Sequence, residues 1–284
     1  FRSSLVNIGF DADTINLNTQ DISNNINALV LADPKMDLSP VVLDKLKNYI
    51  DKGGNIMVNG EPGKQYVVNP LLSHIGVQLM NGQILQPTFH ETPDKVLPWI
   101  TPAATGQWEA LALYKNLKPG KYVLLRTPGT TGITNTGDKG FKAAALATTQ
   151  LDSTWLKAGP VIIDSTLPPF SPMEGDLKEP SFNTMQQLTR NINGKEQRIM
   201  ITGDADYASN RRFGDALNFP FMIGTYSWLT DSKFPISMFR PGPKDVFLNI
   251  GERTAYYQKI VFVWVLPALI LIGGTILLIR RKRK

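Results

Sequence analysis

The sequence has 284 residues, of which 42% are apolar and 19% charged, a balance typical of a folded protein rather than a disordered one. Its formal net charge of +6 belongs to the tail: six basic and no acidic residues lie from Lys259 onward, and the preceding 258 residues hold 24 of each sign. This distribution does not support a nucleic-acid-binding footprint, and the lack of cysteine excludes disulfides, a thiol nucleophile and a thiolate metal site.

The amino-terminal stretch begins at Phe1 without an initiator methionine or an apolar signal core. We therefore expect a segment upstream of it in the full-length protein. Ser3–Phe10 predicts the end of a helix, and Asp13–Leu17 predicts a strand.

The next stretch has the pattern of a βαβ unit. Ala28–Ala32 (ALVLA) is a short continuous apolar run, typical of a strand buried on both faces. Ser39-Pro40 begins a helix, because the hydroxyl can accept an orphan amide and proline loses nothing at the first helical position. Gly53-Gly54 ends this helix, and Asn55–Asn59 (NIMVN) predicts the next buried strand. Such units pair their strands in parallel, in a layered sheet with helices on both faces.

Two further elements follow before the pattern changes. Asn69–Gly76 predicts a short helix closed by its terminal glycine. Val77–Leu85 predicts a hairpin, because Asn81-Gly82 is a strong signal for a tight turn.

The middle of the chain is less regular. We expect residues 86–150 to form an irregular, β-rich section, with an apolar alternation at Ala110–Tyr114 and an exposed loop at Gly129–Gly140. Pro160–Asp164 (PVIID) predicts a buried strand. Four prolines between residues 167 and 180 predict a surface excursion.

The stretch Arg198–Asn210 repeats the pattern of a strand followed by an acidic turn. Ile199–Ile201 predicts the strand, Gly203–Asp206 the turn, and Asp215–Leu229 the helix after it. Together these elements predict the α/β class, with a layered, mostly parallel sheet flanked by helices.

The carboxyl-terminal stretch predicts a transmembrane helix over residues 260–279, which are twenty residues without a charge. At roughly 1.5 Å per residue they span about 30 Å, the thickness of the bilayer hydrocarbon. Basic residues 280–284 (RRKRK) predict a cytoplasmic tail by the positive-inside rule. Residues 1–250 then form an extracytoplasmic domain, joined by a juxtamembrane linker at 251–259.

Charged residues follow several of the predicted strands, where parallel sheets bind ligands. They are Asp33, Lys35, Glu61, Asp164, Asp204 and Asp206. Converging carboxylates can hold a divalent cation or act in acid–base chemistry, but acids after strands also serve as turn formers and caps. The chain has two histidines and lacks a G-x-S-x-G elbow, a Walker A loop and G-x-G-x-x-G. We interpret the six residues as the rim of a ligand or partner site and predict no catalytic residue, metal or cofactor.

Four tryptophans offer another interpretation, a carbohydrate or peptide groove. They are Trp99, Trp108, Trp155 and Trp228. Tryptophans are also common in cores and interfaces, which is the alternative here.

Three pieces of the chain carry a family resemblance: ALVLADPKMDLSPVVLDKLKNYIDKGGNIMVNGEP, KEQRIMITGDADYASN with its following helix, and the apolar helix with RRKRK. Together they resemble the gliding-motility-associated auxiliary component of bacterial ABC transporters. The resemblance implies an outer domain similar in fold to class I glutamine amidotransferases, which is a flavodoxin-like arrangement, beside an ABC-2-type permease. The amidotransferase cysteine has no counterpart in this cysteine-free chain, so no catalytic residue is carried over.

The resemblance also implies a location and partners. The chain is expected in the bacterial inner (cytoplasmic) membrane, with its main domain in the periplasm. Its expected partners are the permease and ATPase subunits of the transporter, because the chain has no phosphate-binding loop of its own.

The function expected from the sequence is therefore a non-enzymatic auxiliary role, in which the outer domain binds a partner protein or the exported substrate. Two alternatives stay open. One is a membrane-anchored hydrolase or metal-dependent enzyme that uses the acidic strand ends, and the other is a cell-envelope carbohydrate-binding module.

Overall fold

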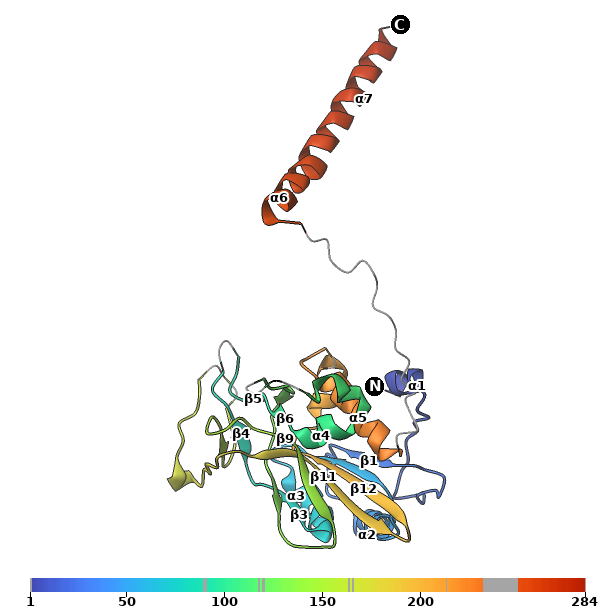
Figure 1. The fold of residues 1–284 in the computed structure, drawn as a ribbon, viewed down its shortest axis with the longest axis vertical. Helices are drawn as coiled ribbons and strands as arrows, with labels where there is room; N and C mark the ends of the chain where they lie inside the picture. The colour runs from blue at the N-terminus through green and yellow to red at the C-terminus, as the bar shows by residue number, and fades with distance from the viewer. Residues whose placement is uncertain are drawn as a thin grey trace. The chain divides into compact units, whose positions relative to one another are not determined.

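A six-stranded sheet is the centre of the first of two units, Phe1–Ser237 and Met238–Lys284, into which the chain divides (Figure 1). The structure is a computed structural model. It describes residues 2–88, 91–116, 118, 121–162, 164, 166–212, 214–231 and 250–283.

The central sheet is mixed rather than mostly parallel. Its strands, in spatial order, are β1 (Leu29–Ala32), β2 (Ile56–Asn59), β12 (Lys195–Thr202), β11 (Asn183–Ile192), β9 (Lys142–Thr148) and β6 (Trp99–Ile100). β1, β2 and β12 are parallel, whereas β11, β9 and β6 join them through antiparallel pairs. The predicted α/β class and the helix-flanked sheet are confirmed, and the parallel part is limited to three strands.

A two-residue turn explains why the antiparallel half begins at β11. Ile192 pairs with Lys195, so Asn193 and Gly194 alone connect the strands. Their φ angles are 51° and 80°. Two successive positive φ values match a turn whose twist fits a β-hairpin, and asparagine followed by glycine adopts it at low cost.

The predicted βαβ unit is confirmed in sequence order and pairing. Helix α2 (Pro40–Asp51) begins with proline after Ser39, whose hydroxyl oxygen accepts a hydrogen bond from the Val42 amide at 3.4 Å. The helix ends before Gly53, which has a φ of 91°. The strand after it, β2, is fully buried, but β1 is not. β1 is an edge strand, and Val30 is 38% exposed there, so the prediction that both its faces are buried is wrong.

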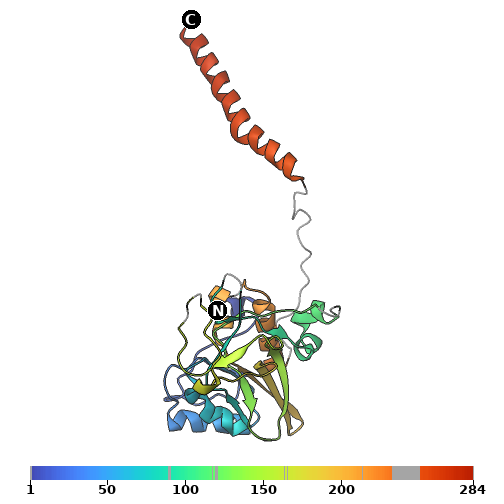
Figure 2. The ribbon, with the colours of Figure 1, turned by 90° about the vertical axis from the view of Figure 1, so that its left-hand side faces the viewer.

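Helices cover both faces of the sheet, so the unit has three layers (Figures 1 and 2). α2 and α3 (Gln65–Leu72) pack on one face, and α4 (Pro102–Gln107), the 3₁₀ helix η2 (Glu109–Tyr114) and α5 (Asn218–Leu229) pack on the other.

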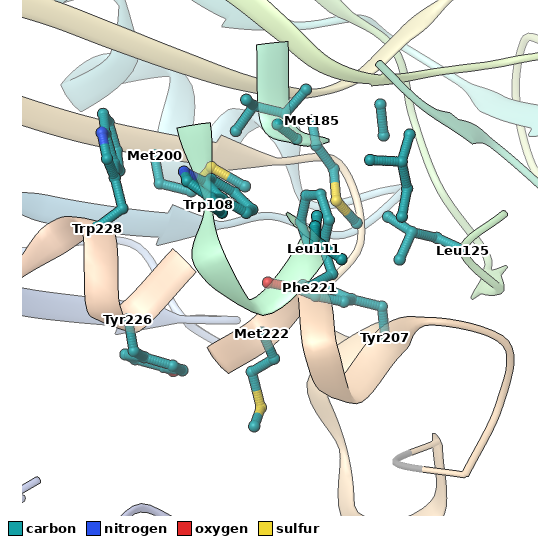
Figure 3. Packing of buried hydrophobic residues seen from close by; sticks show 14 of the residues in the cluster. Trp108, Leu111, Leu125, Met185, Met200, Tyr207, Phe221, Met222, Tyr226 and Trp228 are labelled. Carbon is teal, nitrogen blue, oxygen red and sulfur yellow. The ribbon is translucent and has the colours of Figure 1, made fainter. Parts of the chain in front are cut away.

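Two hydrophobic cores follow from the alternation of side chains along the strands. Ile56 and Val58 of β2 join the α2–α3 core, whereas Met57 between them joins the core under α5. In the same way β12 sends Ile199 to the first core and Met200 to the second. Figure 3 shows the second core. Its aromatic members include Trp108, Tyr207, Phe221, Tyr226 and Trp228.

The remaining elements of the unit lie outside the six-stranded sheet. They are α1 (Arg2–Asn7), η1 (Ser73–Ile75), β3 (Val77–Leu79), β4 (Gln83–Leu85), β5 (Lys95–Val96), β7 (Thr127–Pro128), β8 (Ile133–Asn135), β10 (Trp155–Lys157), η3 (Pro172–Glu174), η4 (Asp206–Ala208) and η5 (Asn210–Arg212). The short strands form three two-stranded sheets, β10 with β4, β3 with β8, and β5 with β7.

The hairpin predicted over Val77–Leu85 is wrong. β3 pairs with β8 and β4 pairs with β10, so the two strands around Asn81-Gly82 belong to different sheets. The carbonyl oxygen of Lys157 lies so close to Gly82 that a Cβ atom there would be 2.5 Å from it. The glycine therefore admits a neighbouring strand rather than turning a hairpin.

Other local predictions also differ from the structure. Asp13–Leu17 is not a strand, Ala110–Tyr114 lies in the 3₁₀ helix η2, and the described residues of Pro160–Asp164 form no strand. Only residues 134–140 of the predicted loop Gly129–Gly140 are exposed, because residues 130–133 lie buried beside the sheet. Apolar character alone does not identify a strand in these segments, since pairing depends on partners that are remote in sequence.

The second unit contains one long apolar helix. α6 (Glu252–Ile260), a π-helical turn η6 (Val261–Val265) and α7 (Leu266–Lys282) follow one another without a break, and this 31-residue helix is long and apolar enough to cross a membrane. Residues 252–259 of the predicted linker are thus helical. The wide turn falls just before Pro267, which lacks an amide donor and weakens the regular ladder at that point.

Truncation of the α2 core residue Leu46 should destabilise the first unit. Leu46 is 0% exposed between α2 and the sheet, so Leu46→Ala leaves a cavity and should lower the free energy of unfolding by about 2–5 kcal/mol. Denaturant unfolding of the full chain in detergent, followed by circular dichroism, measures this. Val41→Ala is the matched control, because Val41 is on the same helix and is 55% exposed. Equal effects of the two substitutions would contradict the assigned packing.

Candidate functional site

The carboxyl ends of the parallel strands are joined by backbone hydrogen bonds that continue beyond the strands. The Asp33 amide donates to the Asn59 carbonyl at 3.1 Å, and the Gly60 amide donates to the Thr202 carbonyl at 2.9 Å. The Gly203 amide donates to the Thr184 carbonyl at 2.9 Å. The residues after each strand are therefore fixed against the neighbouring strand, and the acidic turns begin from a rigid edge.

Gly203 occupies a position that admits no side chain. The Thr131 amide donates to its carbonyl at 3.0 Å, and a Cβ atom on Gly203 would lie 2.1 Å from the Thr131 carbonyl oxygen. The chain thus passes against residues 130–131 before turning into Asp204. Asp204 itself is completely buried.

Three carboxyl groups from β2 and β12 gather at this edge. A Glu61 carboxylate oxygen (Oε1) accepts a hydrogen bond from the Ala205 amide at 2.8 Å. Asp204 Oδ1 accepts one from the Asp206 amide at 2.7 Å. Asp204 Oδ2 is buried and has no hydrogen-bond partner among the described residues. Segments 144 residues apart in sequence are thereby linked through side chains as well as through the sheet.

Burial dominates the electrostatics of these acids. Loss of solvent raises the pKa of Glu61 to about 7, and the nearby Asp206 carboxylate acts in the same direction against the hydrogen bond from Ala205. Burial and the neighbouring Glu61 hold the pKa of Asp204 well above its usual range. Near neutral pH the group therefore carries less negative charge than its three carboxyls suggest.

Two lysines add positive charge at the same edge. Asp33, which has a φ of 41°, forms ion pairs with Lys35 and, at 3.2 Å, with Lys64. The Lys64 amine lowers the pKa of Lys35, while the Glu61 and Asp206 carboxylates raise it. Lysine and carboxylate side chains therefore form one interacting group, the strand-end cluster: Asp33, Lys35, Glu61, Lys64, Asp204 and Asp206.

The structure brings together five of the six site residues expected from the sequence. The exception is Asp164, which is exposed in the β10–β11 connection and does not follow a strand. Lys64 was missed by the sequence reasoning. The feature that could have identified Lys64 is its position three residues after Glu61, at the start of α3. From there the Lys64 side chain reaches back to Asp33.

The four tryptophans do not line a common groove. Trp108 and Trp228 are buried together in the core under α5, with ring centroids 6.4 Å apart. Trp99 stacks on Tyr122 with centroids 3.7 Å apart. The aromatic groove considered as an alternative is therefore not formed.

The cluster offers charged and hydrogen-bonding groups but little catalytic equipment. Within the described part of the chain, no three His, Cys, Asp or Glu side chains are placed to hold a metal ion together. A carboxyl group with a pKa near 7 can act as a general acid or base. However, the hydrogen bond to the Glu61 carboxylate comes from backbone, not from a hydroxyl or an imidazole of the described residues.

The fold and the strand-end cluster define an α/β domain with a polar, largely charge-balanced edge, followed in the sequence by one apolar helix. The chain belongs to the family of auxiliary proteins described as "ABC-type uncharacterized transport system", which it matches over residues 1–231.

Beyond the family match, the comparison with solved structures gives a likeness in fold. Comparison with curated proteins finds no match. Among solved structures, the "mmIFT52 N-terminal domain" is similar with a TM-score of 0.52 and 14% identity, over 78% of this chain and 80% of that one. At this identity the likeness shows a shared fold.

Removal of the Glu61 charge should change how stability depends on pH. The folded-state pKa of Glu61, about 7, exceeds the ordinary value of 4.5. The folded state is therefore stabilised by the protonated form of Glu61. This contribution to the free energy of unfolding is complete below about pH 4.5 and is lost as the pH rises through 7. Glu61→Gln cannot ionise and should unfold with a free energy higher by about 2–3 kcal/mol at pH 8, with little difference at pH 4.5.

Denaturant unfolding at a series of pH values measures this difference. Glu109→Gln is the control, because Glu109 is an exposed glutamate. A Glu61→Gln variant that is less stable than the parent at pH 8 would contradict the burial of a destabilised charge.

Proposed function

We propose that this chain is a non-enzymatic, membrane-anchored auxiliary component of a bacterial ABC-2-type transporter, and that its outer domain binds a partner protein or the exported substrate. The observation that carries the proposal is the family match over residues 1–231. The finer resemblance to gliding-motility-associated components, with a glutamine-amidotransferase-like fold, belongs to the same proposal. The parallel β1–β2–β12 core with helices on both faces supports that fold.

Anchoring in the inner membrane is the second part of the proposal. The helix Glu252–Lys282 supports it by its length and composition, and the basic residues at its end support a cytoplasmic carboxyl terminus. The domain would then lie on the periplasmic side, where it can meet the outer surface of a permease.

The strand-end cluster is the proposed contact region. Its paired lysines and carboxylates suit a polar partner surface, since each charge can exchange an internal partner for an external one. Asp164 is not part of this proposed region. The hydrolase alternative is not favoured, because no activated nucleophile accompanies Glu61 among the described residues.

Co-purification tests the transporter assignment. The full chain, tagged and extracted in mild detergent, should retain permease and ATPase subunits that mass spectrometry identifies. Lys35→Glu with Lys64→Glu should weaken this retention, because charge reversal repels the partner surface that fits the cluster. Lys115→Glu with Lys121→Glu, at two exposed lysines elsewhere, is the matched control. Absence of transporter subunits even after cross-linking would refute the proposal.

Cysteine labelling tests the orientation. The chain has no cysteine, so Lys139→Cys in the exposed segment 134–140 provides a single thiol. On spheroplasts this thiol should react with a membrane-impermeant maleimide, and a cysteine at Lys282 should react only after lysis. The reverse pattern would show that the domain is cytoplasmic.

A further inference from the structure

A groove of about 540 Å³ opens at the amino ends of the parallel strands. The strand-end cluster lies at the other end of the same strands. Its walls are the segment before β1, the carboxyl-terminal half of α2, and Lys195 at the start of β12. The volume lies in the range that proteins use for small ligands. The family assignment and the strand-end cluster leave this groove without a role.

The groove carries an excess of positive charge. Lys45, Lys52 and Lys195 line it, against the single acid Asp21. Lys45 is already engaged, since its ammonium lies 2.8 Å from the Asp21 carboxylate and also donates to two backbone carbonyls. Lys52 and Lys195 form no ion pair within the described part of the chain, so two ammonium groups are available to a ligand.

These two lysines belong to the same part of the groove. Lys52 directly precedes Gly53, and the Ile192 side chain, across the β-hairpin turn from Lys195, lies beside Gly53. Both lysines line the groove, so a ligand there can meet ammonium groups from the end of α2 and from the hairpin.

Carbonyl groups at the carboxyl end of a helix repel an anion, but those of Asn48, Tyr49 and Ile50 at the end of α2 already accept hydrogen bonds. The amides of Lys52 and Gly54 donate to the carbonyls of Asn48 and Tyr49, respectively. Arg190 and Gln197 donate to the Ile50 carbonyl at 3.1 Å and 2.7 Å. The negative end of the helix dipole is thus compensated from within the fold.

Amide side chains supply the remaining polar surface. Asn24, Asn27 and Asn48 line the groove, and none of them makes a side-chain hydrogen bond within the described residues. An amide both donates and accepts, which matches the paired donor and acceptor character of sugar hydroxyls. Tyr49 also lines the groove; its hydroxyl donates to the Asn55 carbonyl at 3.0 Å, and Gly54 packs against its ring.

We propose that this groove binds an acidic saccharide, with a sugar carboxylate held by Lys52 and Lys195 and the sugar hydroxyls held by the asparagine amides. The inference rests on the proposed function in one respect, since it gives the outer domain of a transporter component its ligand class. Binding itself needs only this chain, so it can be tested without the transporter.

Isothermal titration calorimetry of the full chain in detergent micelles tests the proposal, with trigalacturonate as the probe. Binding with a Kd between about 10 μM and 1 mM is expected, and Lys52→Ala with Lys195→Ala should weaken it at least about tenfold by removing two charge-assisted bonds. Asn48→Leu should weaken it about threefold to tenfold through the loss of one amide. The matched control, Lys115→Ala with Lys121→Ala, should leave the affinity unchanged.

Two further ligands separate the contribution of the sugar hydroxyls to binding from that of the carboxylates. Maltotriose has the hydroxyls without the carboxylates, and tricarballylate has three carboxylates without the hydroxyls. Both should bind at least about tenfold more weakly than trigalacturonate. Equal binding of either ligand, or no effect of the double lysine substitution, would overturn the proposal. If the chain retains transporter subunits on purification but does not bind trigalacturonate, the saccharide proposal is refuted and the transporter assignment stands. If it binds trigalacturonate but retains no transporter subunits, only the transporter assignment is refuted.

Discussion

The double parallel pairing of β2, with β1 on one side and β12 on the other, is the interaction on which the rest of the first unit depends. It sets Met57 opposite both Val30 and Met200, and Asn59 opposite both Ala32 and Thr202. Since side chains alternate along each strand, this register directs Ile56, Val58, Ile199 and Ile201 to the α2–α3 core, and Met57 and Met200 to the core under α5. It also makes the three strands end at one level, which brings residues near positions 33, 61 and 204 to the same edge.

The burial of Asp204 is the main electrostatic cost of this arrangement. A charged carboxylate without full hydrogen bonding is strongly disfavoured away from water. The raised pKa of Asp204 reflects that cost, because burial and the neighbouring Glu61 both disfavour its charged form. The lysines, in turn, pair with the more accessible Asp33 rather than with Asp204. The exposed members of the cluster therefore include Lys35, which pairs with Asp33, and the carboxylate of Asp206.

Local chemistry made the βαβ unit predictable, whereas remote pairing made the other half of the sheet unpredictable. Ser39-Pro40 and Gly53 define the bounds of α2 from sequence, and the acids after β1, β2 and β12 were placed at one edge because parallel strands end together. The sequence does not predict β11, because Thr184, Gln186 and Gln187 in its first half are polar, although they are buried. Their burial depends on partners in other segments, such as the Ala147 carbonyl that accepts from the Thr184 hydroxyl at 3.1 Å. The strand-end position predicted for Asp164 is wrong for a related reason, because the described residues of the apolar run Pro160–Asp164 form no strand.

The two polar regions of the first unit lie at opposite ends of one helix. α2 starts beside the strand-end cluster at Ser39 and ends at the groove with Lys52, and its twelve residues span roughly 18 Å at 1.5 Å per residue. A small ligand in the groove and a partner at the cluster can therefore be bound together without touching. Energetic coupling between them would need an element with two arrangements. The helix between them is fixed by Val42, Leu46 and Ile50 in a close-packed core, which argues that the two regions act independently of each other.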